Sequence, residues 1–201
     1  NNNTGDYMTL SKDIEENYKH FKNDFVDCSD FLVRKAKIGD KKLFFVACDG
    51  LIDSLQLSQM VVSPILKSED ISIDNIKNSI TNCVELNEAK TFADCYYYIM
   101  SGFAIVVVDG ENIALAFGIQ NPPSRSVDEP TNEQSTKAPK EAFVEILNTN
   151  KALLRKRLKT PHLKLKQIKL ASAAPPPCVL ALHLVLSLIW TTEPIKNLYL
   201  K

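Results

Sequence analysis

The sequence predicts an α/β (mixed α+β) fold, and three observations lead to this prediction. Apolar, β-prone runs at 31–38, 42–48 and 103–108 are bounded by Gly-Asp or Asp-Gly pairs, which favour turns. Segments with helical periodicity lie between and after these runs. A proline-marked stretch, Asn121-Pro-Pro-Ser, divides the chain into two unequal halves. We therefore expect two small α/β subdomains, each a mixed sheet packed with helices.

The expected division has three parts. Residues 1–20 form a flexible tail and the start of the first helix, 21–120 the first subdomain, and 121–201 the second, atypical beyond about 171. The chain has 201 residues, enough for a sizeable core. Its longest apolar run, 178–190, is shorter than the roughly 20 residues that cross a bilayer. The chain as given is therefore expected to be soluble.

The first subdomain is expected to begin with a helix at 10–27 capped by Ser11. A hairpin of 31–38 and 42–48 follows, turning at Gly39-Asp40. After it, the spacing of Leu55, Leu57, Met60, Val61 and Ile65 is helical. Pro64 is expected to kink the last turn of that helix.

Two more helices and a second hairpin complete the first half. The helices are expected at 73–79 and 92–101, and Gly102 ends the second one. The hairpin joins 103–108 to 112–117 through Asp109-Gly110. It is the strongest hairpin signal in the chain, because Asp-Gly suits the primed turns that hairpins prefer.

The second half is dominated by a predicted helix at 139–159. Pro139 suits its first turn, where a missing N–H costs nothing. Its apolar stripe comprises Phe143, Leu147, Leu154 and Leu158, with Ile146 and Leu153 beside it. Asn150 falls in the middle of this stripe, so we expect its side chain to be buried and to bind the backbone of the loop at 126–137. A buried amide without partners would cost about 1–3 kcal/mol.

Beyond this helix the pattern changes twice. Leucine and lysine alternate at 163–170 with a change of phase at Gln167, which predicts a bulged strand. The leucines at 180–188 repeat with period two, which suits a strand, although such a run also fits a buried helix.

The residues give no sign of catalytic, metal or cofactor chemistry, so we expect no enzyme. His20, His162 and His183 lie far apart and lack metal-ligand spacing. No nucleotide-binding or nucleophile-elbow motif is present. The pairs Asp49-Gly50 and Asp109-Gly110 are explained by turn chemistry. The five cysteines form no Cys-x-x-Cys pair and are interpreted as reduced and structural.

Charge is balanced overall but uneven along the chain. With 24 acidic and 24 basic residues, the formal net charge is zero. Between Ile146 and Thr192, however, no acidic residue occurs. The basic residues there are Lys151, Arg155, Lys156, Arg157, Lys159, Lys164, Lys166 and Lys169. A solvated face is the first interpretation, and a patch for anionic headgroups or an acidic partner is the second. Nucleic acid is not expected, because aromatic residues are not interleaved for stacking.

The stretch from Arg125 to Leu158 resembles the signature of GerA-type spore germination receptor A subunits. The matching residues are Arg125, Glu129, Pro130, Pro139, Glu141, Phe143, Glu145, Asn150, Leu153, Arg155 and Arg157. The segments LFFVACDGLID, YYYIMSGFAIVVVDG and ENIALAF resemble earlier blocks of the family in the same order. The resemblance covers roughly 25–170. Ala138 and Ala142 stand where the family has glycine. The loss of the family pattern after Leu170 would also follow from a local reading-frame slip in the source sequence.

This resemblance implies a function and a set of interface residues. The chain would be the soluble N-terminal domain of a nutrient germinant receptor A subunit. The full-length parent would lie in the spore inner membrane of a Firmicutes-like bacterium, with this domain on one side of that membrane. Its implied partners are the B and C subunits and a small-molecule germinant (an amino acid, sugar or nucleoside), with self-association left open. The candidate structural, ligand or subunit-interface residues are Arg125, Glu129, Pro130, Glu141, Phe143, Glu145, Asn150, Arg155 and Arg157.

A second class of function stays open on the sequence alone. The chain would then be a free-standing α/β interaction or scaffold domain without ligand sensing, and its long helix would be the interface. In the receptor interpretation, a cleft between the two subdomains is the candidate ligand site, because ligands commonly bind between lobes. The identity of the germinant is not readable from these residues.

Overall fold

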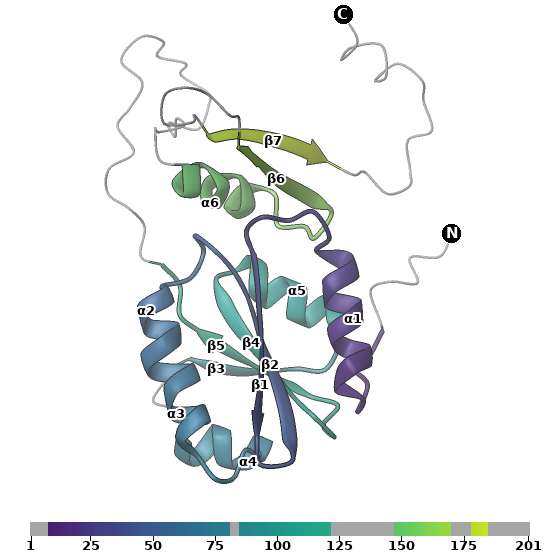
Figure 1. Cartoon of the computed structure of the whole chain (residues 1–201), viewed down its shortest axis with the longest axis vertical. Coiled ribbons are helices and arrows are strands. Elements are labelled where there is room, and N and C mark those ends of the chain that lie inside the picture. The colour runs from purple at the N-terminus through teal and green to yellow at the C-terminus, as the bar shows by residue number, and fades with distance from the viewer. Residues whose placement is uncertain (1–7, 81–84, 122–146, 170–177, 185–201) are drawn as a thin grey trace, which may run out of the picture.

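A five-stranded antiparallel sheet forms the centre of the fold in the residues that the computed structural model describes, 8–80, 85–121, 147–169 and 178–184 (Figure 1). Its strands lie in the order β1-β2-β4-β5-β3. They are β1 (Phe31–Ile38), β2 (Lys41–Cys48), β3 (Leu86–Ala89), β4 (Phe103–Val108) and β5 (Ala114–Gly118). The predicted combination of helices and sheet is confirmed. Every described pairing is antiparallel, where mixed sheets were expected, because short turns join β1 to β2 and β4 to β5.

Both predicted hairpins form, and their turn residues explain why. Gly39 and Gly110 have φ of +56° and +84°, a conformation that costs glycine little. Strands β1 and β2 then pair along their full length, from Phe31 opposite Cys48 to Ile38 opposite Lys41. Strand β3 was not predicted, because Leu-Asn-Glu-Ala contains few β-forming residues. It forms by pairing with β5, with Leu86 opposite Phe117.

Helices cover both faces of the sheet, giving three layers (Figure 1). On one face lie α1 (Ile14–Asp24) and α5 (Phe92–Met100). The other face is covered by helical segments from one continuous part of the chain. These are α2 (Ser54–Gln56), the π-helix η1 (Leu57–Val62), α3 (Ser63–Lys67), α4 (Ile73–Asn75) and the π-helix η2 (Ile76–Ile80).

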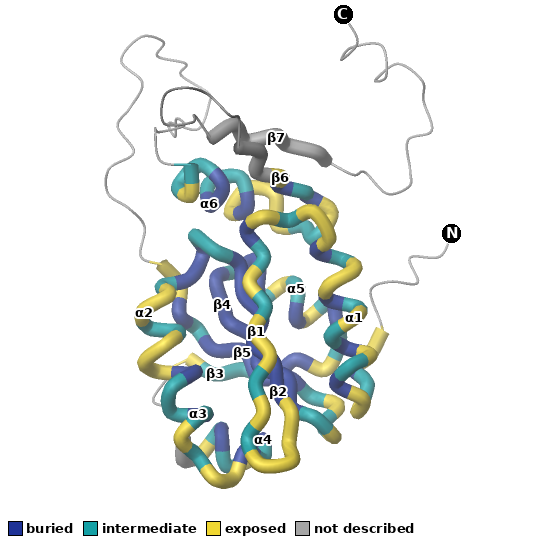
Figure 2. Tube along the Cα trace, in the orientation of Figure 1, coloured by how far each residue is buried: buried dark blue, intermediate teal, exposed yellow. Residues whose placement is uncertain are grey.

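The central strands are apolar throughout because they are buried on both faces. In β4 all six residues are buried, and alternate side chains enter opposite cores. Phe103, Ile105 and Val107 join the core under α1 and α5, whereas Ala104, Val106 and Val108 join the opposite one. Figure 2 shows these central strands in dark blue between more exposed helices. This explains why the runs in β2 and β4 are continuous and do not alternate with polar residues.

The first helix begins later than predicted. Asp13, and not Ser11, is its N-cap, and its side chain accepts a hydrogen bond from the Glu15 N–H at 2.8 Å. Asn17 accounts for the difference, because its buried side chain accepts from the Ser11 N–H and donates to the Ser11 carbonyl. These bonds hold residue 11 outside the helix.

The predicted irregularity near Pro64 is a π-helical turn. Pro64 lies in the first turn of α3 and has no N–H to donate to the preceding turn. The Ser63 N–H bonds to the Ser58 carbonyl five residues earlier, which is π-helical spacing. The helical periodicity of 55–65 is therefore real, but the helix is widened over Leu57–Val62.

A smaller unit lies above the three layers (Figure 1). It contains α6 (Leu147–Arg157) and the antiparallel pair β6 (Leu163–Lys169) and β7 (Cys178–Leu184). Of the two alternatives for 180–188, a strand or a buried helix, the strand is observed as far as Leu184. The bulge predicted at Gln167 does not occur, because Gln167 pairs directly with Leu180 in an unbroken register. The boundary predicted at Asn121–Arg125 stays a prediction, since residues 122–146 lie outside the description.

Candidate functional site: a buried ion pair between α6 and the sheet

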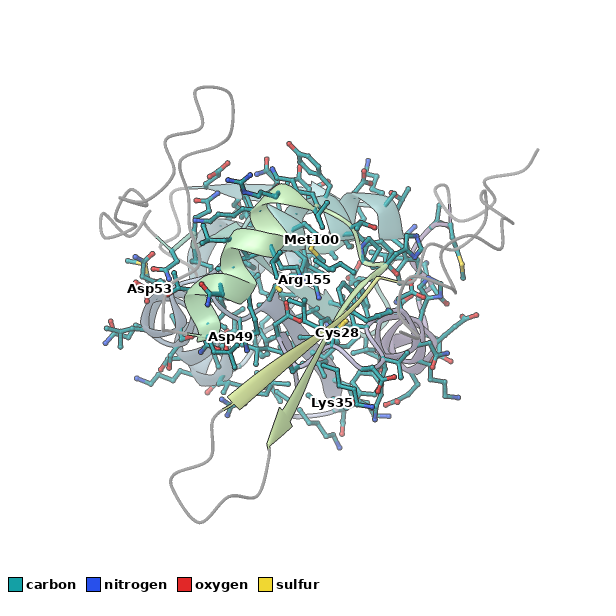
Figure 3. The ribbon with its side chains drawn as sticks, turned by 90° about the horizontal axis from the view of Figure 1, so that it is seen from above. Cys28, Lys35, Asp49, Asp53, Met100 and Arg155 are labelled. Carbon is teal, nitrogen blue, oxygen red and sulfur yellow. The ribbon has the colours of Figure 1, made fainter. Side chains whose placement is uncertain are left out.

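Helix α6 turns a polar face inward. Its buried residues are Lys151, Ala152 and Arg155, and the exposed fraction of Arg155 is 0%. Figure 3, seen from above, shows α6 crossing the three layers with Arg155 near the centre. A buried arginine requires a partner of opposite charge, because an unpaired charge in the interior is very costly.

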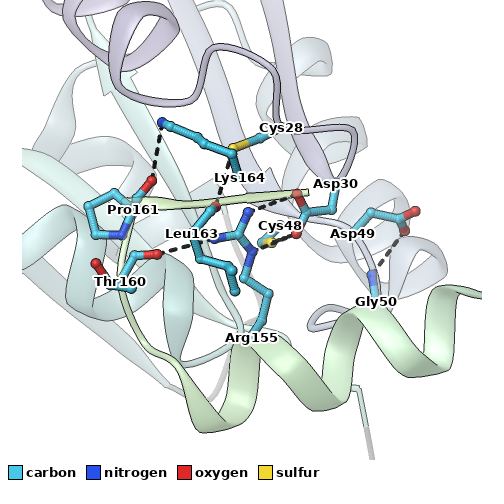
Figure 4. Close-up of polar contacts among 10 residues, drawn as sticks. All are labelled: Cys28, Asp30, Cys48, Asp49, Gly50, Arg155, Thr160, Pro161, Leu163 and Lys164. Atoms are coloured by element: carbon cyan, nitrogen blue, oxygen red, sulfur yellow. Dashed lines mark hydrogen bonds and ion pairs between the residues drawn. The ribbon is translucent and has the colours of Figure 1, made fainter. Parts of the chain in front are cut away.

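The partner is Asp30, in the turn that leads into β1. Arg155 donates to both carboxylate oxygens of Asp30, through Nε to Oδ2 at 2.6 Å and through an Nη to Oδ1 at 2.9 Å (Figure 4). The other Nη donates to the Thr160 carbonyl at 3.2 Å, just beyond the helix. Such a two-bond arrangement fixes orientation as well as charge. It joins residues that are 125 positions apart in the chain.

Asp30 is also held from the sheet side. The Cys48 thiol donates to Asp30 Oδ2 at 3.2 Å, and the Asp49 N–H donates to the Asp30 carbonyl at 2.7 Å. Asp30 itself is completely buried. The Asp30 carboxylate therefore accepts hydrogen bonds from α6 and from the end of β2 simultaneously. It links the position of α6 to the sheet.

The electrostatics of the site favour the charged form of Arg155. Burial alone would lower the pKa of the Arg155 guanidinium, but the hydrogen bonds and attraction from Asp30 outweigh it and raise that pKa. Burial, followed by the nearby Asp30 carboxylate, raises the pKa of the Cys48 thiol. Arg155 thus stays positive, and Cys48 stays a protonated hydrogen-bond donor.

Close backbone contact supports the ion pair. A Cβ added to Gly50 would lie 3.2 Å from the Asn148 carbonyl and 3.3 Å from the Ala152 Cβ. Gly50 also has φ of +82°, which other residues rarely adopt. Turn chemistry accounts for the Asp49-Gly50 pair. Gly50 has a second role, because the absence of a side chain lets α6 approach the sheet.

Strand β6 attaches the smaller unit at the segment between α1 and β1. The Ser29 N–H donates to the Leu165 carbonyl at 2.8 Å, and the Cys28 thiol lies 3.6 Å from the Leu163 carbonyl. The Lys164 ammonium donates to the Asp24 and Pro161 carbonyls. Leu163 and Leu165 are fully buried. The segment 24–30 is therefore a shared platform for α6 and β6.

Three of the nine predicted interface residues lie in the described part of α6. Arg155 is buried in the ion pair, whereas Arg157 is exposed. Asn150 is half-buried, where a buried side chain was expected. The face is rotated from the prediction because Lys151 and Arg155 occupy the inner positions and leave Leu158 42% exposed.

The other six predicted residues, Arg125, Glu129, Pro130, Glu141, Phe143 and Glu145, lie outside the described residues, and so does the loop expected to bind Asn150. Sequence reasoning missed the residues that complete the site, namely Asp30, Cys48, Gly50 and Thr160. Asp30 gave no local signal, because it is one of 24 acidic residues and follows no motif.

The predicted basic segment does not form one surface. Lys151 and Arg155 are buried, and Lys164 is half-buried with its ammonium bonded to carbonyls. Lys156, Arg157, Lys159 and Lys166 are exposed. Among the described residues, no cluster of three or more His, Cys, Asp or Glu side chains is placed to hold a metal. In the same residues no helix has the length and apolar character to cross a membrane.

The fold of this chain is shared with a solved structure. It matches the crystal structure of the N-terminal domain of the A subunit of the Bacillus megaterium spore germinant receptor GerK3 with a TM-score of 0.61. The match covers 89% of this chain and 67% of that one at 24% identity, so it demonstrates a shared fold.

The chain belongs to the Bacillus/Clostridium GerA spore germination protein family, whose model matches residues 19–181. This match extends past Leu170, where the family pattern was expected to end. Two relatives from Bacillus subtilis are spore germination protein B1, 30% identical over 81% of this chain, and spore germination protein KA, 26% identical over 82%. The chain spans about a third of their lengths, 35% and 32%.

Proposed function

We propose that this chain is the N-terminal domain of a nutrient germinant receptor A subunit and that α6 relays a conformational signal between its two parts. The domain takes part in germinant sensing and in receptor assembly with B and C subunits at the spore inner membrane. The observation that carries the proposal is the buried Arg155–Asp30 pair, which couples the helix of the family signature to the sheet.

The Arg155–Asp30 pair suits a relay because its two hydrogen bonds form only in a narrow range of geometries. A bidentate pair tolerates little change in the angle of α6, since both hydrogen bonds depend on one planar geometry. Gly50 lets α6 lie close to the end of β2, since a Cβ there would lie only 3.2 Å from the Asn148 carbonyl. A shift of α6 therefore has to be followed by the 24–30 segment or break the pair, which is how a packed interface becomes a two-state element.

We propose no catalytic role for the domain. The buried thiols of Cys48 and Cys95 are poor nucleophiles, because burial raises their pKa and the reactive species is the thiolate. The family relatives are named as spore germination proteins. The proposed ligands are an amino acid, sugar or nucleoside germinant, and the proposed partners are the other subunits of the same receptor.

The test replaces Arg155 with lysine in the full-length gene. Lysine keeps the charge but lacks the planar fork, so both hydrogen bonds to Asp30 cannot form together. The matched control is Lys156→Ala, an exposed neighbour on the same helix. Germination is followed by loss of optical density of spores, and the amount of receptor by immunoblot.

Three outcomes separate the roles. Slower germination of the Arg155→Lys spores at a normal receptor level supports the relay. A lowered receptor level supports a role in assembly and overturns the relay. Normal germination at a normal level overturns both. The alternative of a free-standing scaffold domain would be supported by a full-length reading frame without a membrane region.

A further inference from the structure

A half-open cavity of about 300 Å³ lies on the sheet face opposite α1 and α5, between the edge strand β1 and the helical segment α2–η1. Its apolar wall comprises Leu32, Phe45, Ala47, Leu57 and Val62. Three polar side chains also line it: Arg34 from β1, and Ser54 and Ser58 from the helical segment. The chemistry of this lining is distinct from that of the α6 site.

The cavity follows from the strand register and from the path of the helices. Arg34 pairs with Phe45 and Leu32 with Ala47, so these side chains share one face of the sheet. The helical segment buries Val61 and Ile65 over the central strands. It does not cover the edge strand, where Leu32 keeps 39% of its surface exposed. The result is a groove with an apolar floor beside β1, the edge strand of the described sheet.

The polar groups in the groove are placed to receive an anion. Ser54 and Ser58 are one helical turn apart and therefore lie on the same side of the helix. Arg34 makes no ion pair with any residue that the structure describes. Among the residues that the structure describes, no acidic side chain lines the cavity. Leu57, Ser58 and Val62 belong to the π-helix η1, a feature frequent at functional sites.

We propose that this groove binds a small monocarboxylate with an apolar body, such as a short-chain fatty acid anion. The carboxylate accepts hydrogen bonds from the Arg34 guanidinium and the serine hydroxyls, and the apolar body packs on Phe45, Ala47 and Leu57. A free amino acid is disfavoured, because its ammonium group would meet no carboxylate in the lining. The binding depends only on this groove and not on the α6 relay.

The experiment titrates the 201-residue chain with sodium hexanoate, using isothermal titration calorimetry and the amide chemical shifts of β1 and η1. Hexan-1-ol, hexylamine and norleucine serve as analogues that lack the anion or add an ammonium group. We expect saturable binding of hexanoate, and binding at least tenfold weaker for each analogue.

Three variants locate the site. Arg34→Gln should weaken hexanoate binding about tenfold or more. Lys37→Gln removes the same charge from the opposite face of β1 and should change it less than twofold. Ser58→Phe fills the groove from an exposed position and should abolish binding without touching the core.

Any of four results would overturn the proposal. These are the absence of saturable binding, equal binding of hexan-1-ol, equal binding of norleucine, or unchanged affinity in both Arg34→Gln and Ser58→Phe. Thermal melting of each variant identifies loss of fold. If one of the two variants is unfolded, the other decides the result.

Discussion

The two faces of the central sheet are covered by different means. On the side of α1 and α5, the cover is aromatic and comes from distant parts of the sequence. Phe21 of α1 contacts Phe44, Phe92 and Tyr96 with ring-centroid distances of 5.2–5.9 Å. On the opposite side the cover is aliphatic and comes from one continuous segment, 54–80, with buried Val61, Ile65 and Ile76.

The comparison shows which side is connected to distant parts of the chain. Ala152 of α6 belongs to the core under α1 and α5, and Arg155 of the same helix forms an ion pair with a residue 125 positions away. The opposite face contains two π-helices and the open groove beside β1. A ligand on that face would act locally, through β1. Strand β1 is common to both, because its first residue follows Asp30 directly.

The largest expected effect comes from breaking the buried Arg155–Asp30 ion pair. Arg155→Met leaves Asp30 buried without its charge partner and should lower the free energy of unfolding by about 3–5 kcal/mol. Ile65→Val on the opposite face should cost about 0.5–1.5 kcal/mol. Urea unfolding followed by circular dichroism measures both. Combining Arg155→Met with Asp30→Leu should recover part of the loss, because no unpaired charge then remains.

A loss below about 1 kcal/mol for Arg155→Met would contradict a buried, coupled pair. The control is Lys156→Met, which changes the same charge at an exposed position of α6 and should change stability by less than about 0.5 kcal/mol.

A pair of glycines sharpens the comparison further. Gly50 and Gly110 have φ of +82° and +84°, so replacement by alanine imposes a similar backbone cost of about 1–2 kcal/mol at each. Only Gly50 has α6 within contact distance, whereas no atom lies within 4 Å of a Cβ on Gly110. We expect Gly50→Ala to cost about 1–3 kcal/mol more than Gly110→Ala because of overpacking. Equal losses of stability in Gly50→Ala and Gly110→Ala would mean that α6 shifts to accommodate the added methyl group at little cost.

Much of this fold was predictable because its signals are local. The β1–β2 and β4–β5 hairpins follow from apolar runs joined by glycine turns, which neighbouring residues determine. The four-residue β3 carries too few β-forming side chains for such a signal. It is specified by the open edge of β5, which exists only in the folded chain.

The candidate site was predictable only in part. Arg155 was selected through the resemblance, but its burial was not, because an arginine on an amphipathic helix usually faces solvent. Its partner Asp30 is 125 residues away, and no spacing rule connects them. The apolar stripe therefore indicated the wrong inner face for α6 and placed Asn150 too deep. Long-range charge pairing overrode local hydrophobic periodicity there.

The smallest expected effect compares two carboxylates near helix N-termini, one on each face of the sheet, as the pH falls. Burial would raise the pKa of Asp94, but hydrogen bonds with Thr91 and the Lys90 N–H lower it below 3.8. Hydrogen bonds from Ser72 lower the pKa of Asp70, on the opposite face, in the same direction. A carboxyl whose pKa is lower in the folded state stabilises fully above its unfolded pKa, about 3.8, and this contribution is lost as the pH falls through the folded value.

Asp94→Asn should therefore cost about 0.3–1 kcal/mol at pH 7, since it removes a negative charge from the first turn of α5. The difference from the unmodified chain should shrink as the pH falls below about 3.8. Asp70→Asn should show the same pH dependence with a smaller change, because Asp70 lies outside α4, two residues before its N-cap Ser72, and α4 has only three residues. Urea unfolding at pH 7, 5 and 3 measures both variants. If Asp70→Asn had the larger effect at pH 7, the capping box of α5 would contribute less to stability than the hydrogen bonds between Asp70 and Ser72.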